Sequence, residues 1–165
     1  MTGDASNDVE ALVSALRDPL KGGVSLFGPH ARVLAVALLG RLKTGPEVVA
    51  TAPNPAGPHD VLAAVSSAFV EAATVAGYPE AHPWRSLAGP IGDPRHHWED
   101  RFDLFAVHLL PNYPVLLLVE SPGADPDLER LVAAWVGRPS AGTVLVASPH
   151  PFGPTDDPRW LVHQA

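Results

Sequence analysis

The stretch Val115-Leu116-Leu117-Leu118-Val119 decides which fold this sequence is expected to adopt. An unbroken run of valine and leucine bounded by turn residues is typical of a central strand buried on both faces. Directly before it, residues 101–110 alternate in a strand-like way, with Phe102 and Leu104 on one face. The turn at residues 111–114 joins the two stretches, which together predict an antiparallel pair of strands.

On the C-terminal side, Asp125 is placed to cap a helix that begins at Pro126 and ends at Gly137. Its apolar residues recur at helical spacing: Leu128, Leu131, Val132 and Trp135. After this helix, residues 143–147 form the last predicted strand.

Upstream of the central run, residues 59–76 give the strongest helical pattern in the chain. Residues 47–52 are rich in valine and threonine and predict a strand. Residues 32–39 are almost entirely apolar, so their periodicity fits a strand or a helix, and we favour a strand antiparallel to 47–52. A short amphipathic helix is expected over residues 7–16.

From residue 47 onward the predicted order is strand, helix, strand, strand, helix, strand, which is the ferredoxin-like β-α-β-β-α-β arrangement. We therefore expect one α+β domain over residues 1–165, with a mainly antiparallel sheet, an N-terminal helix and one extra strand. A long loop rich in Pro, Gly, His and Trp is expected over residues 77–100, and a proline-rich tail over 148–165.

Composition excludes several classes of protein. The 165 residues carry a net charge of −7 and no basic stripe, so no nucleic-acid partner is expected. No apolar run reaches the roughly 20 residues of a membrane span, and the N-terminus is polar and acidic, so we expect a cytoplasmic protein with no membrane partner. The absence of cysteine excludes disulfides, thiolate zinc sites and iron–sulfur clusters. The sequence does not determine the oligomeric state, and a homo-oligomer is one possibility.

Histidine and tryptophan supply the candidate site residues. Without cysteine, a metal or haem would need His, Asp, Glu, Tyr or Met as a ligand. His150 follows the last predicted strand, and His82 and His97 lie in the long loop; His150 and His97 are the candidate metal ligands. Trp84 and Trp98 frame the loop and could line a pocket for a planar cofactor. The alternative is that these histidines are solvated and the tryptophans hold the loop on the core.

Three short motifs resemble the YqcI/YcgG-type family of bacterial proteins. They are His82-Pro83-Trp84, then Asp93-Pro94 followed by Trp98, and finally Pro149-His150-Pro151-Phe152. The resemblance implies a haem-dependent oxygenase acting on amino or guanidino nitrogen, with His150, His82 or His97 as the axial haem ligand. The chain departs from the family in lacking cysteine and in having only Arg130 where the family has an arginine cluster.

Two functions are therefore expected. The first is a small haem-dependent or other metal-dependent enzyme, an oxygenase with a small nitrogen-containing substrate. The second is a non-enzymatic ferredoxin-like binding or assembly module, because such a fold exposes strand edges. No P-loop, GxGxxG or GxSxG motif occurs in the chain.

Overall fold

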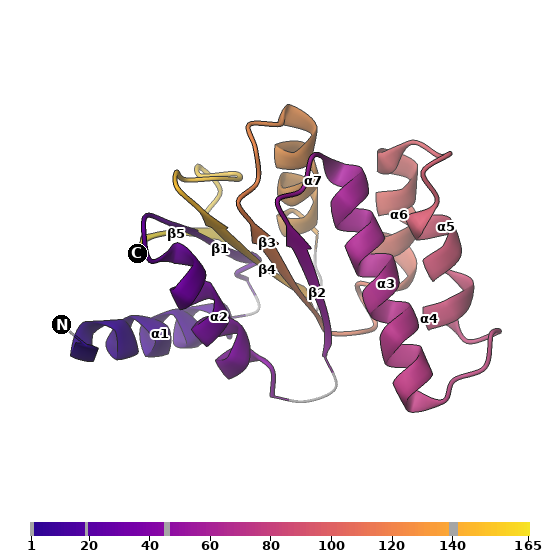
Figure 1. Cartoon of the computed structure of the whole chain (residues 1–165), viewed down its shortest axis with the longest axis horizontal. Helices are drawn as coiled ribbons and strands as arrows, with labels where there is room; N and C mark the ends of the chain where they lie inside the picture. The colour runs from indigo at the N-terminus through magenta and orange to yellow at the C-terminus, as the bar shows by residue number, and fades with distance from the viewer. Residues whose placement is uncertain (1, 19, 45–46, 139–141) are drawn as a thin grey trace.

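The computed structural model describes residues 2–18, 20–44, 47–138 and 142–165. Its centre is one sheet with strand order β2-β3-β4-β1-β5 (Figure 1). The strands are β1 (Gly23–Phe27), β2 (Val48–Pro53), β3 (Val115–Glu120), β4 (Gly142–Ser148) and β5 (Trp160–Gln164). Every pair of neighbouring strands in this sheet is parallel. The chain is therefore an α/β protein, and the predicted α+β, ferredoxin-like, mainly antiparallel sheet is wrong.

The run 115–119 is the central strand that its composition predicts. β3 lies between β2 and β4, with Val115 opposite Val48 on one side and Gly142 on the other. Its side chains alternate between two cores: Leu117 and Val119 pack on one face of the sheet and Leu118 packs on the other.

Helices cover both faces of the sheet, because parallel strands need long crossover connections. One face carries α1 (Thr2–Leu16) and α2 (Ala31–Leu42). The other face carries α3 (Pro58–Ala76), α4 (Pro83–Ser86), α5 (Ala88–Gly92), α6 (Trp98–His108) and α7 (Pro126–Val136) (Figure 1). The helices predicted over 59–76 and 126–136 are confirmed, and the N-terminal helix starts earlier than predicted.

The predicted strand over residues 101–110 is a helix, α6. Its buried apolar residues follow a helical spacing and not an alternation of two: Phe102, Phe105, Ala106 and Leu109. The start of α6 also carries helix signals, since the His97 side chain accepts a hydrogen bond from the Glu99 N–H and Glu99 and Asp100 occupy the first turn. The sequence suggested a strand because, over a few residues, apolar and polar side chains of a helix can also alternate.

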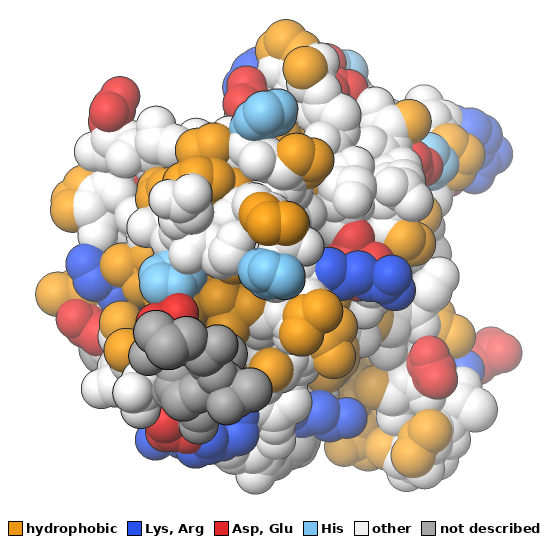
Figure 2. Space-filling view, turned by 60° about the vertical axis from the view of Figure 1, so that its left-hand side comes forward, with side chains coloured by type: hydrophobic (Ala, Val, Ile, Leu, Met, Phe, Trp, Pro, Cys, Tyr) orange, Lys and Arg blue, Asp and Glu red, His pale blue; other side chains and the backbone are white. Residues whose placement is uncertain are grey.

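The predicted strand over residues 32–39 is likewise a helix, α2. Its buried positions again follow helical spacing: Ala31, Leu34, Ala35 and Leu38. Val33 and Val36 point outward, with 73% and 53% of their surface exposed. Viewed from the side of α1, the surface shows hydrophobic side chains dispersed among polar and charged ones (Figure 2). Apolar residues on the outer face of α2 explain why periodicity in this stretch did not separate helix from strand.

The region predicted as a long loop, residues 77–100, contains the short helices α4 and α5 and the start of α6. The buried Arg101 side chain fastens it to the domain, because its Nε donates to the Ile91 carbonyl at 2.8 Å and its Nη2 lies 3.0 Å from His59 Nδ1. Burial lowers the pKa of Arg101, and the nearby negative charge of Asp93 opposes that shift. The proline-rich tail also contains a strand, β5, which pairs with β1 at the edge of the sheet.

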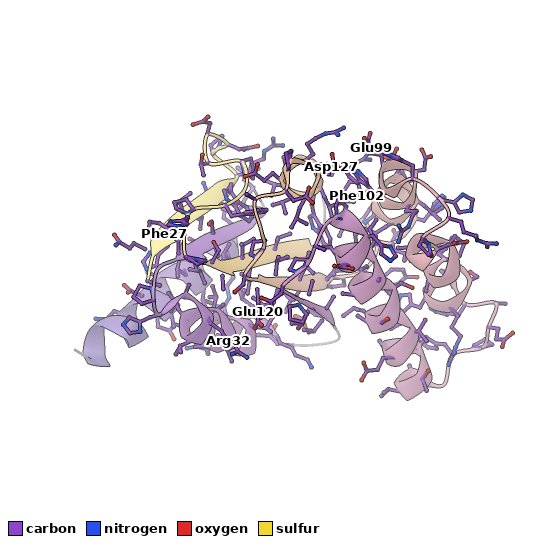
Figure 3. All side chains as sticks on the ribbon, turned by 45° about the horizontal axis from the view of Figure 1, so that its top comes forward. Phe27, Arg32, Glu99, Phe102, Glu120 and Asp127 are labelled. Atoms are coloured by element: carbon purple, nitrogen blue, oxygen red, sulfur yellow. The ribbon has the colours of Figure 1, made fainter. Side chains whose placement is uncertain are left out.

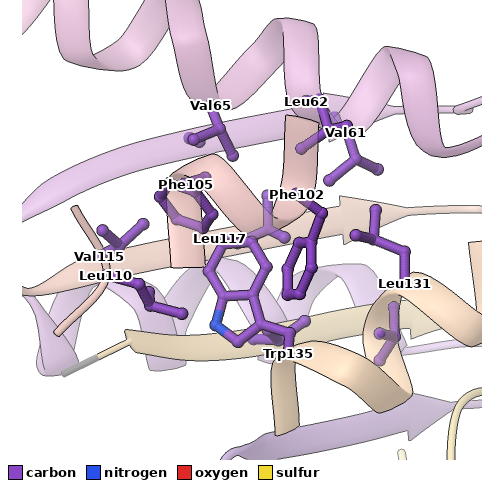
Figure 4. Packing of buried hydrophobic residues seen from close by; sticks show 14 of the residues in the cluster. Val61, Leu62, Val65, Phe102, Phe105, Leu110, Val115, Leu117, Leu131 and Trp135 are labelled. Carbon is purple, nitrogen blue, oxygen red and sulfur yellow. The ribbon is translucent and has the colours of Figure 1, made fainter. Parts of the chain in front are cut away.

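The larger core lies between the sheet and α3, α6 and α7 (Figure 4). Phe105 and Trp135 are nearly fully buried there, with ring centroids 5.0 Å apart. Among the described residues, α3 is the one helix long and apolar enough to cross a membrane by length and composition alone. Its residues Val61, Leu62 and Phe69 are fully buried in this core.

Replacing Leu117 with alanine should lower the free energy of unfolding by about 2–5 kcal/mol, because the side chain fills the core from the central strand and leaves a cavity when shortened. Val33→Ala on the exposed face of α2 is the control and should change it by less than about 0.5 kcal/mol. Urea denaturation of the three proteins measures both values, and equal effects would contradict this core.

Candidate functional site

All five strands run in the same direction, so their carboxyl ends lie along one edge of the sheet. A pocket of about 440 Å³ lies at this edge. It is lined by the residues that follow β1, β2 and β3, by the first turn of α2 and by the end of β4. We call it the carboxyl-edge pocket.

The topology explains why a hollow forms here. The chain leaves β1 toward α2, on one face of the sheet, whereas it leaves β2 and β3 toward α3 and α7, on the opposite face. β1 and β4 are neighbours, and after β4 the chain crosses to the α7 side, where Phe152 is buried. Connections that diverge from adjacent parallel strands leave a crevice outside their carboxyl ends, which is where open α/β sheets bind ligands.

Three residues with positive φ shape the rim of this pocket. Gly28, Asn54 and Ser121 come directly after β1, β2 and β3, with φ of 117°, 47° and 51°. Each donates its N–H to a carbonyl at the end of the next strand: Gly28 to Ser148 (3.1 Å), Asn54 to Glu120 (2.7 Å) and Ser121 to Ala147 (2.8 Å). The backbone ladder thus continues one residue past each strand while the chain turns away. A non-glycine residue in this conformation costs about 1–3 kcal/mol, and such residues cluster at functional sites.

The charged groups of the pocket are Arg32 and Glu120 (Figure 3). Arg32 lies in the first turn of α2 with 78% of its side chain exposed, and Glu120 ends β3 with 17% exposed. Arg32 Nε and Glu120 Oε1 are 3.6 Å apart, which is an ion pair longer than a hydrogen bond. Asn54 and Ser121 add an amide and a hydroxyl to the lining.

The serines beside the pocket are engaged with the backbone. Ser148 Oγ donates to the carbonyl oxygen of His150, and Ser25 Oγ accepts the Phe152 N–H at 2.9 Å. Both bonds fasten the segment after β4 to the sheet. Ser148 is therefore paired with the main chain of His150 and not with its imidazole, as a serine nucleophile would require.

The connection between β1 and α2 consists of Gly28, Pro29 and His30. A P-loop at this position needs a longer glycine-rich loop ending in Lys and Ser or Thr, whose lysine reaches the terminal phosphates of a nucleotide. This connection has neither the length nor the lysine. The pocket can offer one guanidinium, one carboxylate and neutral polar groups, which is a set suited to recognising a small polar molecule.

A second hollow, of about 290 Å³, lies between α6 and α7. Arg130 lies over the ring of Trp98 and Arg138 over the ring of Phe102, at 5.5 and 5.6 Å from the ring centroids. Both guanidiniums are already bonded to carboxylates: Arg130 to Glu99 and Asp127, and Arg138 to Asp103. The two arginines of this groove already have carboxylate partners and so have less to offer a charged ligand. The carboxyl-edge pocket is the better candidate site.

The structure assigns local roles to the predicted loop residues. His82 Nδ1 accepts the Trp84 N–H at 3.2 Å at the start of α4, and its ring stacks on Tyr78. Trp84 packs edge-on against Phe69 and Tyr113, at the opposite end of β3 from the pocket.

His97 and Trp98 are the corresponding pair at the start of α6. His97 Nδ1 accepts the Glu99 N–H at 3.3 Å, and its ring lies against Trp98. His150 is exposed in the segment after β4, near the pocket in sequence but not part of its lining. The contacts of the described residues do not join His150 to His82 or His97.

The described part of the chain contains no group of three His, Asp or Glu side chains that could hold a metal ion. The expectation of a metal site is therefore not supported, and the parallel sheet overturns the ferredoxin-like description. Haem binding also finds no support in the structure, but it is not tested by this observation, because one axial histidine can hold a haem. The residues of the carboxyl-edge pocket were missed because their signal depends on the topology. Each follows a strand, and that position becomes informative only once the strands are known to be parallel.

Comparison with known protein families and with curated proteins finds no match to this chain. Among solved structures, it is similar to a chain in the structure of Drosophila ORC bound to AT-rich DNA and Cdc6, with a TM-score of 0.46 and 13% identity over 90% of this chain and 50% of that one. It is also similar to the Aeropyrum pernix ORC2 protein in ADPNP–ADP complexes, with a TM-score of 0.39 and 17% identity over 88% and 41%. The chain thus spans half or less of the length of either.

The first of these structures is described as bound to DNA, so the expected absence of a nucleic-acid partner is not carried forward. With both TM-scores below 0.5, neither likeness carries an argument about what this chain binds. The resemblance to the YqcI/YcgG-type family is not tested by these comparisons.

Replacing His97 with alanine should lower the free energy of unfolding by about 1 kcal/mol, because the first turn of α6 loses the acceptor for the Glu99 N–H. His97→Asn should recover most of this loss, since asparagine is a good N-cap residue. Thermal and urea denaturation measure both variants. If His97→Asn is as unstable as His97→Ala, capping is not what His97 contributes.

Replacing Ser121 with valine should lower the free energy of unfolding by about 1–2 kcal/mol, because a β-branched residue tolerates positive φ poorly. Ser121→Gly should be at least as stable as the wild type, since glycine adopts this conformation without steric cost. Urea denaturation of the pair isolates the backbone effect, and equal stability of the two variants would contradict it.

Proposed function

We propose that this chain is a small-molecule-binding domain whose ligand occupies the carboxyl-edge pocket. The observation that carries the proposal is the position of the pocket. It lies where connections diverge to opposite faces of a parallel sheet, beside β1 and β4. Ligands of open α/β sheets bind in such crevices because loops from several strands can reach the same molecule there.

The size and lining of the pocket support this function. Its volume of about 440 Å³ lies within the range of small-molecule sites. Four separate segments contribute to it, so a bound molecule would be contacted from several sides. The positive φ of Asn54 and Ser121 is a further support, because the chain accepts a conformational cost at this rim.

The polar groups favour binding over catalysis. Ser148 is bonded to the main chain, and the partner of Glu120 is Arg32, so the described lining offers no nucleophile held by a general base. A guanidinium, a carboxylate, an amide and a hydroxyl are groups that orient a polar ligand. A small-molecule-binding domain on a parallel α/β fold shares the non-enzymatic character of the binding or assembly module expected from the sequence, but its ligand enters a pocket and does not pair with an exposed strand edge.

The test is a thermal-shift screen of the intact protein against nucleotides, sugar phosphates, organic acids, amino acids and polyamines. A ligand at 100 times its dissociation constant should stabilise the folded state by about 2.7 kcal/mol, which is roughly 5–10 °C in Tm for a domain of this size. Arg32→Glu places a second negative charge beside Glu120, so it should abolish the shift of an anionic or zwitterionic ligand and increase the shift of a polyamine.

Arg41→Glu is the matched control. Arg41 is an exposed arginine on the same helix that pairs with Glu10, outside the pocket. Arg41→Glu should lower the stability of the ligand-free protein at least as much as Arg32→Glu does. It should leave the ligand-induced shift in Tm unchanged. Hits that respond equally to both variants, or the absence of any hit, would overturn the proposal.

A further inference from the structure

We infer that the ligand of the carboxyl-edge pocket is a small zwitterion of the free amino acid class, with its ammonium group at Glu120 and its carboxylate at Arg32. This rests on the proposed function and adds the chemical class of the ligand. The argument starts from the bonding state of the Glu120 carboxylate.

Glu120 is largely buried yet poorly bonded. Its side chain is 17% exposed, and among the described residues its one ion-pair partner is Arg32, at 3.6 Å. The described hydrogen bonds include none to its carboxylate oxygens, although a carboxylate can accept about four. Because Glu120 lines the pocket with these acceptor positions open, a ligand that brings a cluster of N–H donors to this position gains charge-assisted hydrogen bonds there. An ammonium group supplies three.

Arg32 offers the complementary position for an anion. Its side chain is 78% exposed and so is free to reorient, and a guanidinium binds a carboxylate through two parallel hydrogen bonds. It stands in the first turn of the 12-residue helix α2, whose N-cap residue His30 makes no side-chain capping bond. The N-terminal N–H groups of α2 therefore add favourable partial charge on the same side of the pocket.

The charge balance of the pocket selects between ligand classes. Arg32 and Glu120 sum to zero, and they are close enough that a ligand entering between them would loosen the pair. A singly charged ligand would satisfy one of the two groups and leave the other without its partner. A zwitterion replaces one loose ion pair with two charge-assisted ones and keeps the site neutral. Asn54 and Ser121 remain for the rest of the molecule.

The experiment is a titration of uniformly ¹⁵N-labelled intact protein with each standard L-amino acid, followed through the backbone amide signals of Gly28, Asn54 and Ser121. At least one amino acid should shift all three signals. For that amino acid, the analogue without the ammonium group and the analogue without the carboxylate should each bind about tenfold more weakly or worse. For alanine these analogues are propionate and ethylamine.

Two charge-neutralising variants with matched controls complete the test. Glu120→Gln and Arg32→Gln should each weaken binding about tenfold or more, whereas Glu129→Gln on the exposed side of α7 and Arg41→Gln on α2 should leave it unchanged. The analogue series on the wild-type protein decides the matter should a pocket variant fail to fold.

The outcomes separate this inference from the proposed function. If no amino acid shifts the three signals, or if a singly charged analogue binds as tightly as the zwitterion, the inference is overturned. If the thermal-shift screen finds a ligand of another class that shifts the same signals, the proposed function stands and the inference falls. If neither experiment finds a ligand at the pocket, both fail.

Discussion

The parallel pairing of β3 with β2 on one side and β4 on the other is the constraint on which the rest of the structure depends. Two parallel neighbours cannot be joined by a tight turn, so each step along the sheet requires a crossover that returns the chain to the opposite edge. Helices α2 to α7 lie in these crossovers, and they must bury an apolar side against the sheet. The same constraint brings all the carboxyl ends to one edge and so creates the place where a pocket can form.

The divergence of the crossovers then determines where along that edge the pocket lies. Because α2 packs on one face and α3 and α7 pack on the other, the connections separate beside β1. The chain turns sharply at the residues that follow the strands. Two of these residues, Asn54 and Ser121, have positive φ and keep a backbone hydrogen bond to the neighbouring strand. Asn54 and Ser121 therefore combine local backbone strain with a position set by the topology, and they line the same pocket as the ion pair of Arg32 and Glu120.

The histidines and tryptophans of the loop region act locally. His82 and His97 each accept the N–H of the residue two positions on and so begin a helix, and their neighbours Trp84 and Trp98 pack on surrounding rings. A histidine followed by Pro-Trp or Trp-Glu at a helix start serves the same purpose as a serine or aspartate cap. Their density in the sequence reflects how a segment without long helices is held against α3 and α6.

The sequence by itself determined those elements whose pattern is complete within a short window. The buried run of β3, the capped helix α7 after Asp125 and the long helix α3 ending at Gly77 could all be read directly. It did not separate helix from strand in α2 or α6, because apolar side chains there also occupy outward positions such as Val33 and Val107. The tertiary structure decided the direction of the strands, which depends on where each helix finds a face of the sheet to cover. The pocket followed from that decision, since Arg32, Asn54 and Glu120 are far apart in the chain and meet only when parallel strands bring their carboxyl ends to one edge.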